Sequence, residues 1–366
     1  MNNELSSSNQ PWYWFIPWLI WILIIFFYYR LQMMIWSFDL KFKLRMIKRM
    51  IDEDSRRIEG FLKNINVESP SLLINRIANY FVIEPVSIEP IDIIKRYDHL
   101  IRTYDTSIRR IVQEYAGNVN PYTRSLLESS LSIYGVLNQI YRILRHYIII
   151  CERENNYPLM QYLVFIMPQI LRIINTYHKA LDSFLSGKPI GDGAGPLVAL
   201  KLIEMGEVVS KKIVDETAVV EVRVKDRRIF VVKAEGPGSN VGKPGNVLSR
   251  LVDELSGNVD LIITIDAALR LEGERSGELA EGVGAAIGDP GPEKIAIERA
   301  ASKYNIPLKA VIIKMSLEEA LTTMKKELYE ACERTVEFLW RIINESTHAN
   351  STIIVAGIGN SMGIPQ

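Results

Sequence analysis

The sequence has few cysteines and no excess of charge of either sign. Its only two cysteines, Cys151 and Cys332, exclude a disulfide framework and a cysteine-rich zinc module. Lysine plus arginine and aspartate plus glutamate number 43 each. The chain therefore lacks the basic excess that is usual in dedicated nucleic-acid-binding proteins, and we expect no nucleic-acid partner.

Glycine is scarce in the first half of the chain and tryptophan is scarce in the second. Nineteen of the 22 glycines lie from Gly187 onward, and five of the six tryptophans lie in the first 36 residues. Residues 187–366 carry 26 acidic and 22 basic side chains, so the first 186 residues have the basic excess. This asymmetry predicts two different kinds of polypeptide, joined near residues 186 and 187.

One long uncharged run, Pro11–Tyr29, stands near the N-terminus. As a helix it spans about 28 Å, close to the roughly 30 Å of a bilayer core, and aromatic residues stand at both of its ends. The only charged residue before it is Glu4, and large residues follow it, unlike a cleaved signal peptide. We expect a transmembrane helix over residues 11–30 and an extracytoplasmic tail over residues 1–10.

The basic residues near this run all follow it, as Arg30, Lys41, Lys43, Arg45, Lys48 and Arg49. The positive-inside bias then predicts a single-pass protein of the cell membrane, with its N-terminus outside and the bulk of the chain cytoplasmic. Residues 31–50 mix apolar side chains with these cations. They either lie along the inner membrane surface or continue the helix into solvent.

Residues 31–186 have the pattern of an all-α middle domain. Helix breaks are expected at Ser69-Pro70, Glu84-Pro85, Glu89-Pro90, Asn120-Pro121 and Tyr157-Pro158, which indicates about five helices. The apolar stretch Leu163–Ile174 is too short to span a bilayer, so we expect a buried core helix there. This half shows no catalytic signal, and homo-oligomerisation through it is one expected use.

Residues 187–366 have the pattern of an α/β domain. Short β-branched strands alternate with helices, which predicts a mostly parallel sheet with helices on both faces. The expected strands are 218–224, 229–234, 261–265, 310–314 and 352–356, and the expected helices are 196–205, 246–255, 293–304 and 316–344.

Four glycine-rich segments fall where strands or helices should end, namely 191–196, 235–245, 281–288 and 357–363. Ligands of open α/β sheets bind at the carboxyl ends of strands, so these segments suggest a site. A phosphate-binding Walker loop is not present, because only three residues separate Gly238 from Gly242 and a proline follows Lys243. Lys243 either binds an anion or flanks a turn.

Four short motifs resemble hydrogenase-maturation endopeptidases in a circularly permuted order. They are Ile353-Ile-Val-Ala-Gly-Ile-Gly-Asn360, Asp192-Gly-Ala-Gly195, Val231-Val-Lys-Ala-Glu235-Gly-Pro-Gly238 and Leu261-Ile-Ile-Thr-Ile-Asp266-Ala267. In that family the Gly-Ile-Gly-Asn segment runs shortly into an acidic Gly-x-Gly segment and a helix. The resemblance therefore implies that the first and second motifs adjoin in space, although the first strand has moved to the end of the chain.

The resemblance also implies a divalent metal held by two carboxylates and a histidine. Asp192 and Glu235 take the carboxylate positions, but no histidine follows the third strand, which argues against nickel. Asp289, Glu281 or Glu278 could substitute, and an all-oxygen set would favour magnesium, manganese or calcium. Alternatively, Asp192 and Asp266 cap a helix and a turn. The expected ligand-binding residues are Gly193, Gly195, Gly236, Gly238, Lys243, Asp266, Gly357, Gly359 and Asn360.

The whole chain also resembles a family of archaeal membrane-anchored proteins of unknown function. That resemblance implies the same order of anchor, helical middle and glycine-rich end, and it implies no activity. Three hypotheses follow from the sequence. The first is a membrane-tethered hydrolase of the metal-dependent peptidase kind, the second is a module that senses a small charged ligand, and the third is a membrane scaffold. Whether it is an enzyme stays open.

Overall fold

The structure is a computed structural model that describes residues 15–83, 92–288 and 291–366. Several expectations lie outside these ranges. They concern the N-terminal tail, the first residues of the apolar run, the breaks at Glu84-Pro85 and Glu89-Pro90, and the candidate ligand Asp289.

The described part of the first 186 residues is helical, as the sequence predicts. Pro70 and Pro121 each begin a helix, because the missing N–H of proline costs nothing in a first helical turn. The helices are α1 (Ile16–Asn64), α2 (Pro70–Ala78), α3 (Ile93–Ala116), α4 (Pro121–Glu154) and α5 (Tyr157–Ser186).

Two of these helices are long and apolar enough to cross a membrane, judged by length and composition alone. They are the 49-residue α1 and the 30-residue α5. The expectation of a buried core helix around Leu163–Ile174 holds only in part: α5 covers this stretch and continues through Pro168, but only Leu163, Met167 and Ile174 of these residues are buried. No described side chain in the most apolar stretch of α1 is buried in this structure, whereas about a fifth of the corresponding stretch of α5 is buried.

The chain forms two compact units. The first contains residues 1–50 and 139–174, and the second contains residues 51–138 and 175–366. In the first unit the ring of Tyr157 packs against Tyr29 and Trp36, with ring centroids 4.9 and 5.0 Å apart. Lys41 pairs with Glu152 there, so one cation of the predicted basic flank has a partner. The domain boundaries inferred from the sequence stay predictions.

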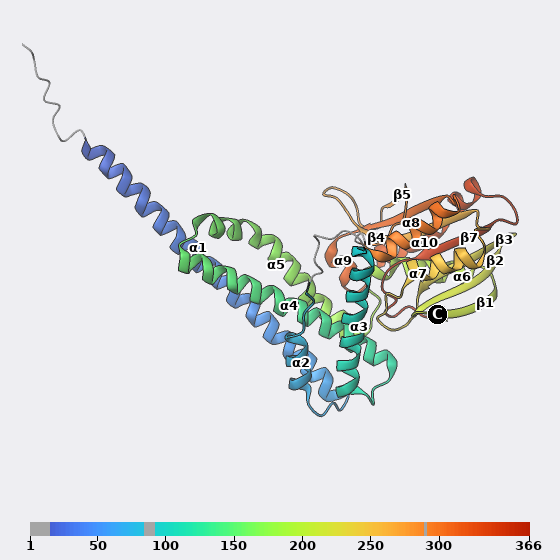
Figure 1. The fold of residues 1–366 in the computed structure, drawn as a ribbon, viewed down its shortest axis with the longest axis horizontal. Coiled ribbons are helices and arrows are strands. Elements are labelled where there is room, and N and C mark those ends of the chain that lie inside the picture. Colours follow the sequence, from blue (N-terminus) through green and yellow to red (C-terminus); the bar gives the residue numbers. More distant parts are fainter. Residues whose placement is uncertain (1–14, 84–91, 289–290) are drawn as a thin grey trace, which may run out of the picture. The chain divides into compact units, whose positions relative to one another are not determined.

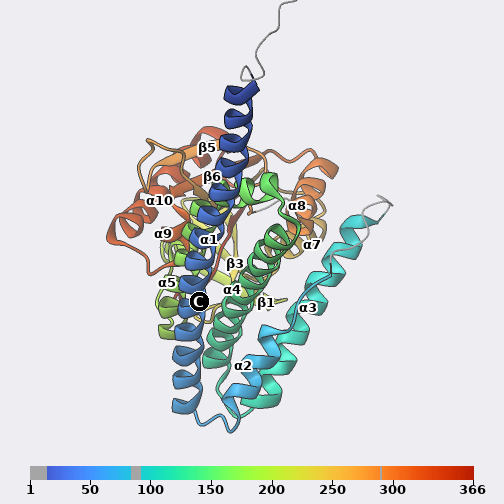
Figure 2. The ribbon, with the colours of Figure 1, turned by 90° about the vertical axis from the view of Figure 1, so that its left-hand side faces the viewer.

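In the second unit, α2 lies beside α3 (Figures 1 and 2). The rings of Tyr80 and Tyr104 stack with their centroids 5.6 Å apart, and Arg76 pairs with Glu114 at 2.8 Å. The sheet belongs to the same unit, so these helices and the glycine-rich half form one packed body.

The sheet has seven strands in the order β1-β2-β3-β7-β4-β6-β5. The four central strands run parallel to one another, whereas β1 and β2 on one side and β5 on the other run antiparallel to their neighbours. The strands are β1 (Glu207–Val214), β2 (Thr217–Val224), β3 (Arg227–Ala234), β4 (Leu261–Leu269), β5 (Leu279–Val283), β6 (Leu308–Met315) and β7 (Thr352–Gly357).

The expectation of a mostly parallel sheet is wrong, because the sheet is mixed. The two edge strands, β1 and β5, carry no apolar run like those of the parallel core. β1 has the sequence EVVSKKIV and is almost wholly exposed, and β5 contains Gly282. Antiparallel edge strands need not be buried on both faces, so their sequences lack the signal that marks a central strand.

The last strand of the chain lies at the centre of the sheet. β7 pairs in parallel with β3 on one side and with β4 on the other, and the side chains of residues 353–356 are fully buried. This confirms that the stretch is an internal strand. Its unbroken apolar sequence is the one expected of a strand covered on both faces.

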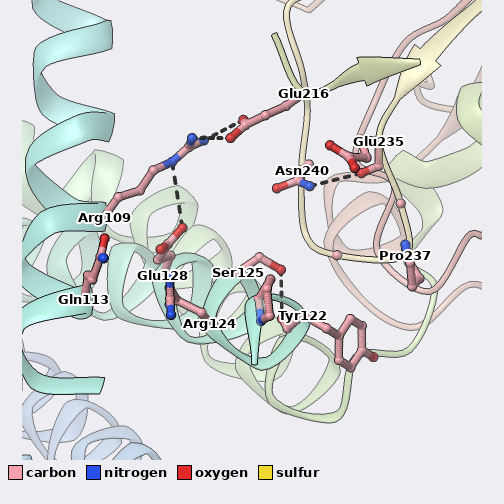
Figure 3. Close-up of a pocket in the computed structure, with 13 residues that line it drawn as sticks. Arg109, Gln113, Tyr122, Arg124, Ser125, Glu128, Glu216, Glu235, Pro237 and Asn240 are labelled. Carbon is pink, nitrogen blue, oxygen red and sulfur yellow. Dashed lines mark hydrogen bonds and ion pairs between the residues drawn. The ribbon is translucent and has the colours of Figure 1, made fainter. Parts of the chain in front are cut away.

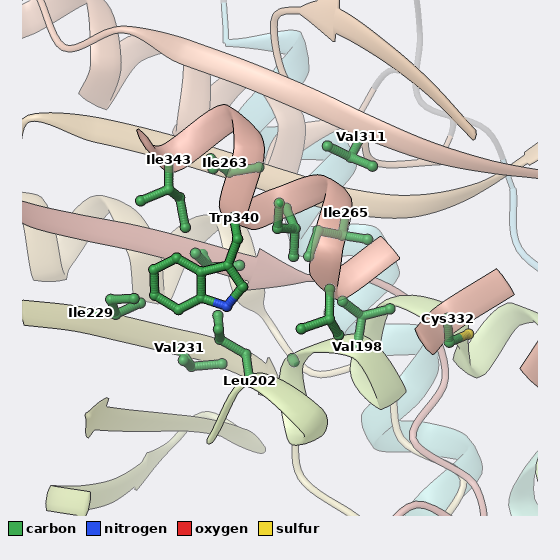
Figure 4. Packing of buried hydrophobic residues seen from close by; sticks show 14 of the residues in the cluster. Val198, Leu202, Ile229, Val231, Ile263, Ile265, Val311, Cys332, Trp340 and Ile343 are labelled. Carbon is green, nitrogen blue, oxygen red and sulfur yellow. The ribbon is translucent and has the colours of Figure 1, made fainter. Parts of the chain in front are cut away.

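Helices cover both faces of this sheet. One face packs against α6 and α10, and Figure 4 shows Trp340 of α10 among Val198, Leu202 and Val231. The other face packs against α7 and α8. The remaining elements are η2 (Gly191–Gly193), α6 (Ala194–Glu204), α7 (Pro244–Glu254), α8 (Pro292–Lys303), α9 (Leu317–Leu321) and α10 (Lys326–Ser346).

Candidate functional site

The loops that follow β3, β7 and β4 meet at the carboxyl ends of these parallel strands. The backbone amide of Asn360, just after β7, donates a hydrogen bond of 2.9 Å to Oδ2 of Asp192 in η2. Gly357 lies against Gly195 at the start of α6. The contact that the permuted order implies between the Gly-Ile-Gly-Asn and Asp-Gly-Ala-Gly segments is therefore present.

Close backbone packing explains the glycines of these segments. A Cβ on Gly195 would lie 2.2 Å from the carbonyl oxygen of Ile358 and 2.6 Å from that of Ile265. Gly359 has a φ of +127°, and a Cβ there would lie 1.9 Å from the carbonyl oxygen of Asp192. Both positions require glycine so that η2 and α6 can approach the ends of β7 and β4.

The same crowding by backbone atoms is found at three more of the glycines predicted to bind ligand, Gly193, Gly236 and Gly357. Their glycine content follows from loop packing, which needs no ligand. Their proposed role in ligand binding stays a prediction.

Asp192 has a carboxyl neighbour that the sequence did not assign to it. The buried side chain of Asp266, in β4, accepts hydrogen bonds of 2.8 Å from the backbone amides of Ala267 and Gly288. Burial, together with the neighbouring Asp192 carboxylate, raises the pKa of Asp266 to about 7. Burial also raises the pKa of Asp192, whereas the Asn360 amide lowers it.

The Glu235 side chain lies away from Asp192 and lines a separate cavity. Its backbone accepts hydrogen bonds from Ser361 and Asn240, and its side chain lines a cavity beside Gly236 (Figure 3). The structure places no interaction between the Glu235 carboxylate and Asp192.

The described donor set does not fit a divalent metal. No group of three or more His, Cys, Asp or Glu side chains among the described residues could hold one. Backbone N–H groups already bind both carboxylate oxygens of Asp266 and one of Asp192. Asp289 follows Gly288 but lies outside the described residues, so the set of Asp192, Glu235 and Asp289 stays a prediction.

A cleft opens where the loop after β3 faces α3 and α4. Its first lobe, about 400 Å³, is lined by Arg109 and Gln113 of α3, by Glu128 and other residues of α4, and by the loop from Glu235 to Asn240 (Figure 3). Its second lobe, about 260 Å³, shares Arg109, Glu128 and Asn240 with the first. We call the two lobes together the α3–α4 cleft.

The second lobe gathers hydrogen-bonding side chains, the two cations Arg109 and Lys243, and three acids, which are Asp105, Glu128 and Glu216. Ser129 Oγ lies 2.8 Å from Ser239 Oγ, which accepts a 3.0 Å hydrogen bond from the side-chain amide of Asn360. Lys243 lines the same lobe, and no carboxylate in the described part of the chain lies within ion-pair distance of its ammonium group. Of the predicted ligand-binding residues, Lys243 and Asn360 therefore share one cavity.

Arg109 faces the β1–β2 turn across the cleft. Its Nη2 donates a 2.7 Å hydrogen bond to Oε2 of Glu216, and its Nη1 pairs with Oε1 of the same carboxylate. Glu128 Oε2 lies 3.9 Å from Arg109 Nε. Figure 3 shows the guanidinium between these two carboxylates, one from the helical side and one from the sheet side.

Two acids on the helical wall have a raised pKa. Burial raises the pKa of Glu128 to about 7, against the lowering effect of Arg109 and Arg124. Burial likewise raises the pKa of Asp105, against Lys243 and Arg109. Near neutral pH Glu128 is therefore protonated in part of the molecules and can then donate a hydrogen bond into the cleft.

Sequence reasoning missed the helical wall of the cleft, which includes Arg109, Glu128 and Ser129. The one available signal was Glu128, an acid between the buried Leu127 and Ser130 of α4. It also missed Lys233, which is fully buried in β3 and donates a 2.9 Å hydrogen bond to the carbonyl oxygen of Pro365. Burial lowers the pKa of Lys233 to about 8.

Comparison with known proteins identifies the family of this chain. A family model described as "Protein of unknown function (DUF1512) N-terminal domain" matches residues 14–187. A second, described as "Domain of unknown function (DUF1512) C-terminal", matches residues 190–365. No curated protein matches the chain. Because the two models together span nearly all of its length, the chain belongs to the DUF1512 family.

Proposed function

We propose that this protein binds a small anionic ligand in the α3–α4 cleft. The observation that carries the proposal is the Lys243 ammonium, which lines the second lobe with no carboxylate of the described residues within ion-pair distance, although the Asp105 carboxylate of the same lobe interacts with it electrostatically. A carboxylate or phosphate group placed there would gain a charge-assisted hydrogen bond, which is about twice as strong as a neutral one.

The position and lining of the cleft support the same proposal. It lies beside the loop that follows β3, at the carboxyl end of a parallel strand, where α/β folds bind their ligands. The Ser129 hydroxyl and the Asn360 amide donate hydrogen bonds to the Ser239 hydroxyl in this lobe, and these three side chains could reorient to donate to an anionic group. Each lobe has room for a small molecule, and α3 and α4 would sense its presence directly.

We further propose that the binding unit is held at the cell membrane by α1, with its N-terminus outside and the cleft in the cytoplasm. Large apolar side chains of α1 stay exposed in this structure, among them Trp18, Trp21 and Phe27. A continuous apolar surface of this kind needs a cover, and lipid is the cover that suits an uncharged 19-residue run. Protease added to intact cells should leave residues 30–366 undigested, and digestion from outside would contradict this orientation.

A hydrolase centre at Asp192 and Asp266 is a second candidate. The specific observation in its favour is the pKa of about 7 for Asp266, which lets this carboxyl group hold or release a proton near neutral pH. An Asp266→Asn variant that binds the anionic ligand but loses any turnover of it would favour this candidate.

The binding proposal is tested with inorganic phosphate and the full chain in detergent micelles. Phosphate titration should be followed by isothermal calorimetry for the wild-type protein and for Lys243→Gln. We expect the substitution to weaken binding about tenfold, which corresponds to one lost charge-assisted hydrogen bond of about 1.4 kcal/mol.

The matched control for this experiment is Lys188→Gln. Lys188 is exposed and lines neither lobe, and its backbone amide, not its side chain, donates a hydrogen bond to the carbonyl oxygen of Ser183. Its loss should leave phosphate affinity unchanged. Equal affinities of wild type and Lys243→Gln would refute the proposal.

A further inference from the structure

We infer that Arg109 is a second anion-binding residue of the cleft. In this structure the Glu216 carboxylate occupies it. The ligand accordingly carries two anionic groups, and one of them displaces Glu216 from Arg109 when the ligand binds. The inference rests on the proposed anion-binding function and adds the class of ligand and the way its binding reaches the rest of the protein.

The guanidinium of Arg109 has the bidentate geometry with which arginine binds anionic groups. Both terminal nitrogens of the guanidinium contact the two oxygens of one carboxylate, that of Glu216. This bidentate arrangement is how arginine recognises carboxylate and phosphate groups in general. Arg109 and Lys243 both line the second lobe, so one molecule with anionic groups at two ends could reach both cations.

The contact with Glu216 is suited to exchange. The side chains of Arg109 and Glu216 are 47% and 38% exposed, and ion pairs with that much exposure add little to stability. Replacement of Glu216 by an anionic group of the ligand therefore costs little stability. It is favoured further because the other anionic group of the ligand is already bound at Lys243. A buried pair would instead resist displacement, because its separation leaves an uncompensated charge.

Displacement of Glu216 would be transmitted to the loop that lines the cleft. The backbone oxygen of Glu216 accepts a 2.8 Å hydrogen bond from the amide of Glu235, where the loop begins. The next residue is Thr217, and its Oγ1 accepts a 2.7 Å hydrogen bond from the backbone amide of Lys243, where the loop ends. Glu216 and Thr217 thus bind both ends of the loop after β3 through hydrogen bonds, and the Glu216 side chain also binds Arg109 of α3.

The test compares probes that carry one and two anionic groups. Inorganic phosphate is compared with pyrophosphate, and acetate with succinate, so that the two pairs also distinguish a phosphate ligand from a carboxylate ligand. We expect wild-type protein to bind the two-group probe of at least one pair about tenfold more tightly. Arg109→Gln should remove that advantage and leave the affinity for the single-group probe unchanged.

Glu216→Gln provides the complementary measurement. Removal of the competing carboxylate should tighten binding of the two-group probe about fivefold, with no change for the single-group probe. Arg110→Gln, an exposed arginine next to Arg109 that lines neither lobe, is the matched control and should behave as wild type.

The two proposals fail in different ways. If Lys243→Gln weakens phosphate binding but Arg109→Gln affects one- and two-group probes equally, or affects neither, the inference about Arg109 is overturned while the proposed function stands. Equal affinity of wild type for both members of each probe pair also overturns it. If Lys243→Gln leaves phosphate binding unchanged, the proposed function itself fails.

Discussion

The backbone amide of Asn360 donates a 2.9 Å hydrogen bond to the carboxylate of Asp192, a residue 168 positions earlier in the chain. The contact brings the loop after the central strand β7 against the start of α6. It depends on glycine, because Gly359 and Gly195 let two backbones meet without side chains between them. The stability of this junction can therefore be tested one residue at a time.

Gly359→Ala should destabilise the second unit strongly. A methyl group there would lie 1.9 Å from the carbonyl oxygen of Asp192, and the φ of +127° is unfavourable for alanine. We expect a loss of about 3 kcal/mol or more in the free energy of unfolding, measured by urea denaturation. Gly282→Ala is the control, because a Cβ there meets nothing within 4 Å. Equal melting of both variants would mean that the junction is looser than described.

Stability should fall as pH rises towards neutrality because of Asp266. The pKa of its carboxyl group is about 7 in the folded protein against a usual 3.8, so between these values the folded state holds a proton that the unfolded chain has released. The associated stability is complete below about pH 4 and is lost by about pH 7. At 1.36 kcal/mol per pKa unit the loss is at most about 4 kcal/mol.

The Asp266 prediction is checked by urea denaturation midpoints between pH 4.5 and pH 8. Asp266→Asn should lower stability at pH 4.5, because an amide N–H₂ would face the N–H of Ala267 or Gly288. The same variant should flatten the pH dependence. An unchanged slope in Asp266→Asn would show that another group causes the pH effect.

His178→Ala should destabilise the junction of α1 with α5. Asp54 is fully buried in α1, its Oδ1 contacts His178 Nδ1 at 2.7 Å, and its Oδ2 has no hydrogen-bond partner. Loss of the imidazole leaves the buried carboxyl with Arg57 alone, 3.7 Å away. We expect a loss of about 3 kcal/mol by thermal denaturation. His146→Ala, at an exposed position of α4, should change stability by less than about 0.5 kcal/mol.

Anion binding in the cleft should strengthen as pH falls through about 7. Protonation of Glu128 removes a negative charge beside Arg109. The other charged groups that act on Glu128 are Arg124, Glu216 and Asp105. Ethane-1,2-disulfonate is the probe of choice, because it carries two anionic groups, one of which can reach Arg109, and its own charge does not change in this range. We expect about fivefold tighter binding at pH 6 than at pH 8, the effect of roughly 1 kcal/mol of charge repulsion.

Glu128→Gln should bind ethane-1,2-disulfonate at pH 8 as tightly as wild type does at pH 6, with little change between the two pH values. The decisive quantity is the change of the dissociation constant with pH. A variant that keeps the full wild-type pH dependence would assign the titration to another group of the cleft, such as Asp105, whose pKa is also raised.

Deletion of residues 1–30 should release the protein from the membrane fraction. The deletion removes the exposed apolar side chains from Phe15 to Tyr29, which we propose to lie in lipid. Cell fractionation with a carbonate wash is the measurement, and a chain without residues 1–9 is the control that should stay in the membrane. If the chain without residues 1–30 stayed in the membrane fraction, the anchor would be assigned to α5, the other described helix with a suitable length and composition.

Local sequence determined several elements of this protein. Pro70 and Pro121 fixed helix starts, because proline lacks the N–H that the helix interior needs. The apolar run at residues 353–356 marked a central strand, because a strand covered on both faces alternates between two buried environments. The edge strands β1 and β5 were missed, because one partner and an open face allow almost any sequence.

The candidate sites were decided by the tertiary structure. The sequence placed Asp192 beside Asn360 but paired it with Glu235, whereas the sheet order brings Asp266 to it and turns Glu235 to the cleft. The cleft itself needs Arg109 and Glu128 from helices more than a hundred residues before the loop. Short-range patterns report local conformation and burial, but which distant surfaces meet depends on the packing of the whole unit. That packing gave Arg109 its partner Glu216 and brought Lys243 into the same cleft.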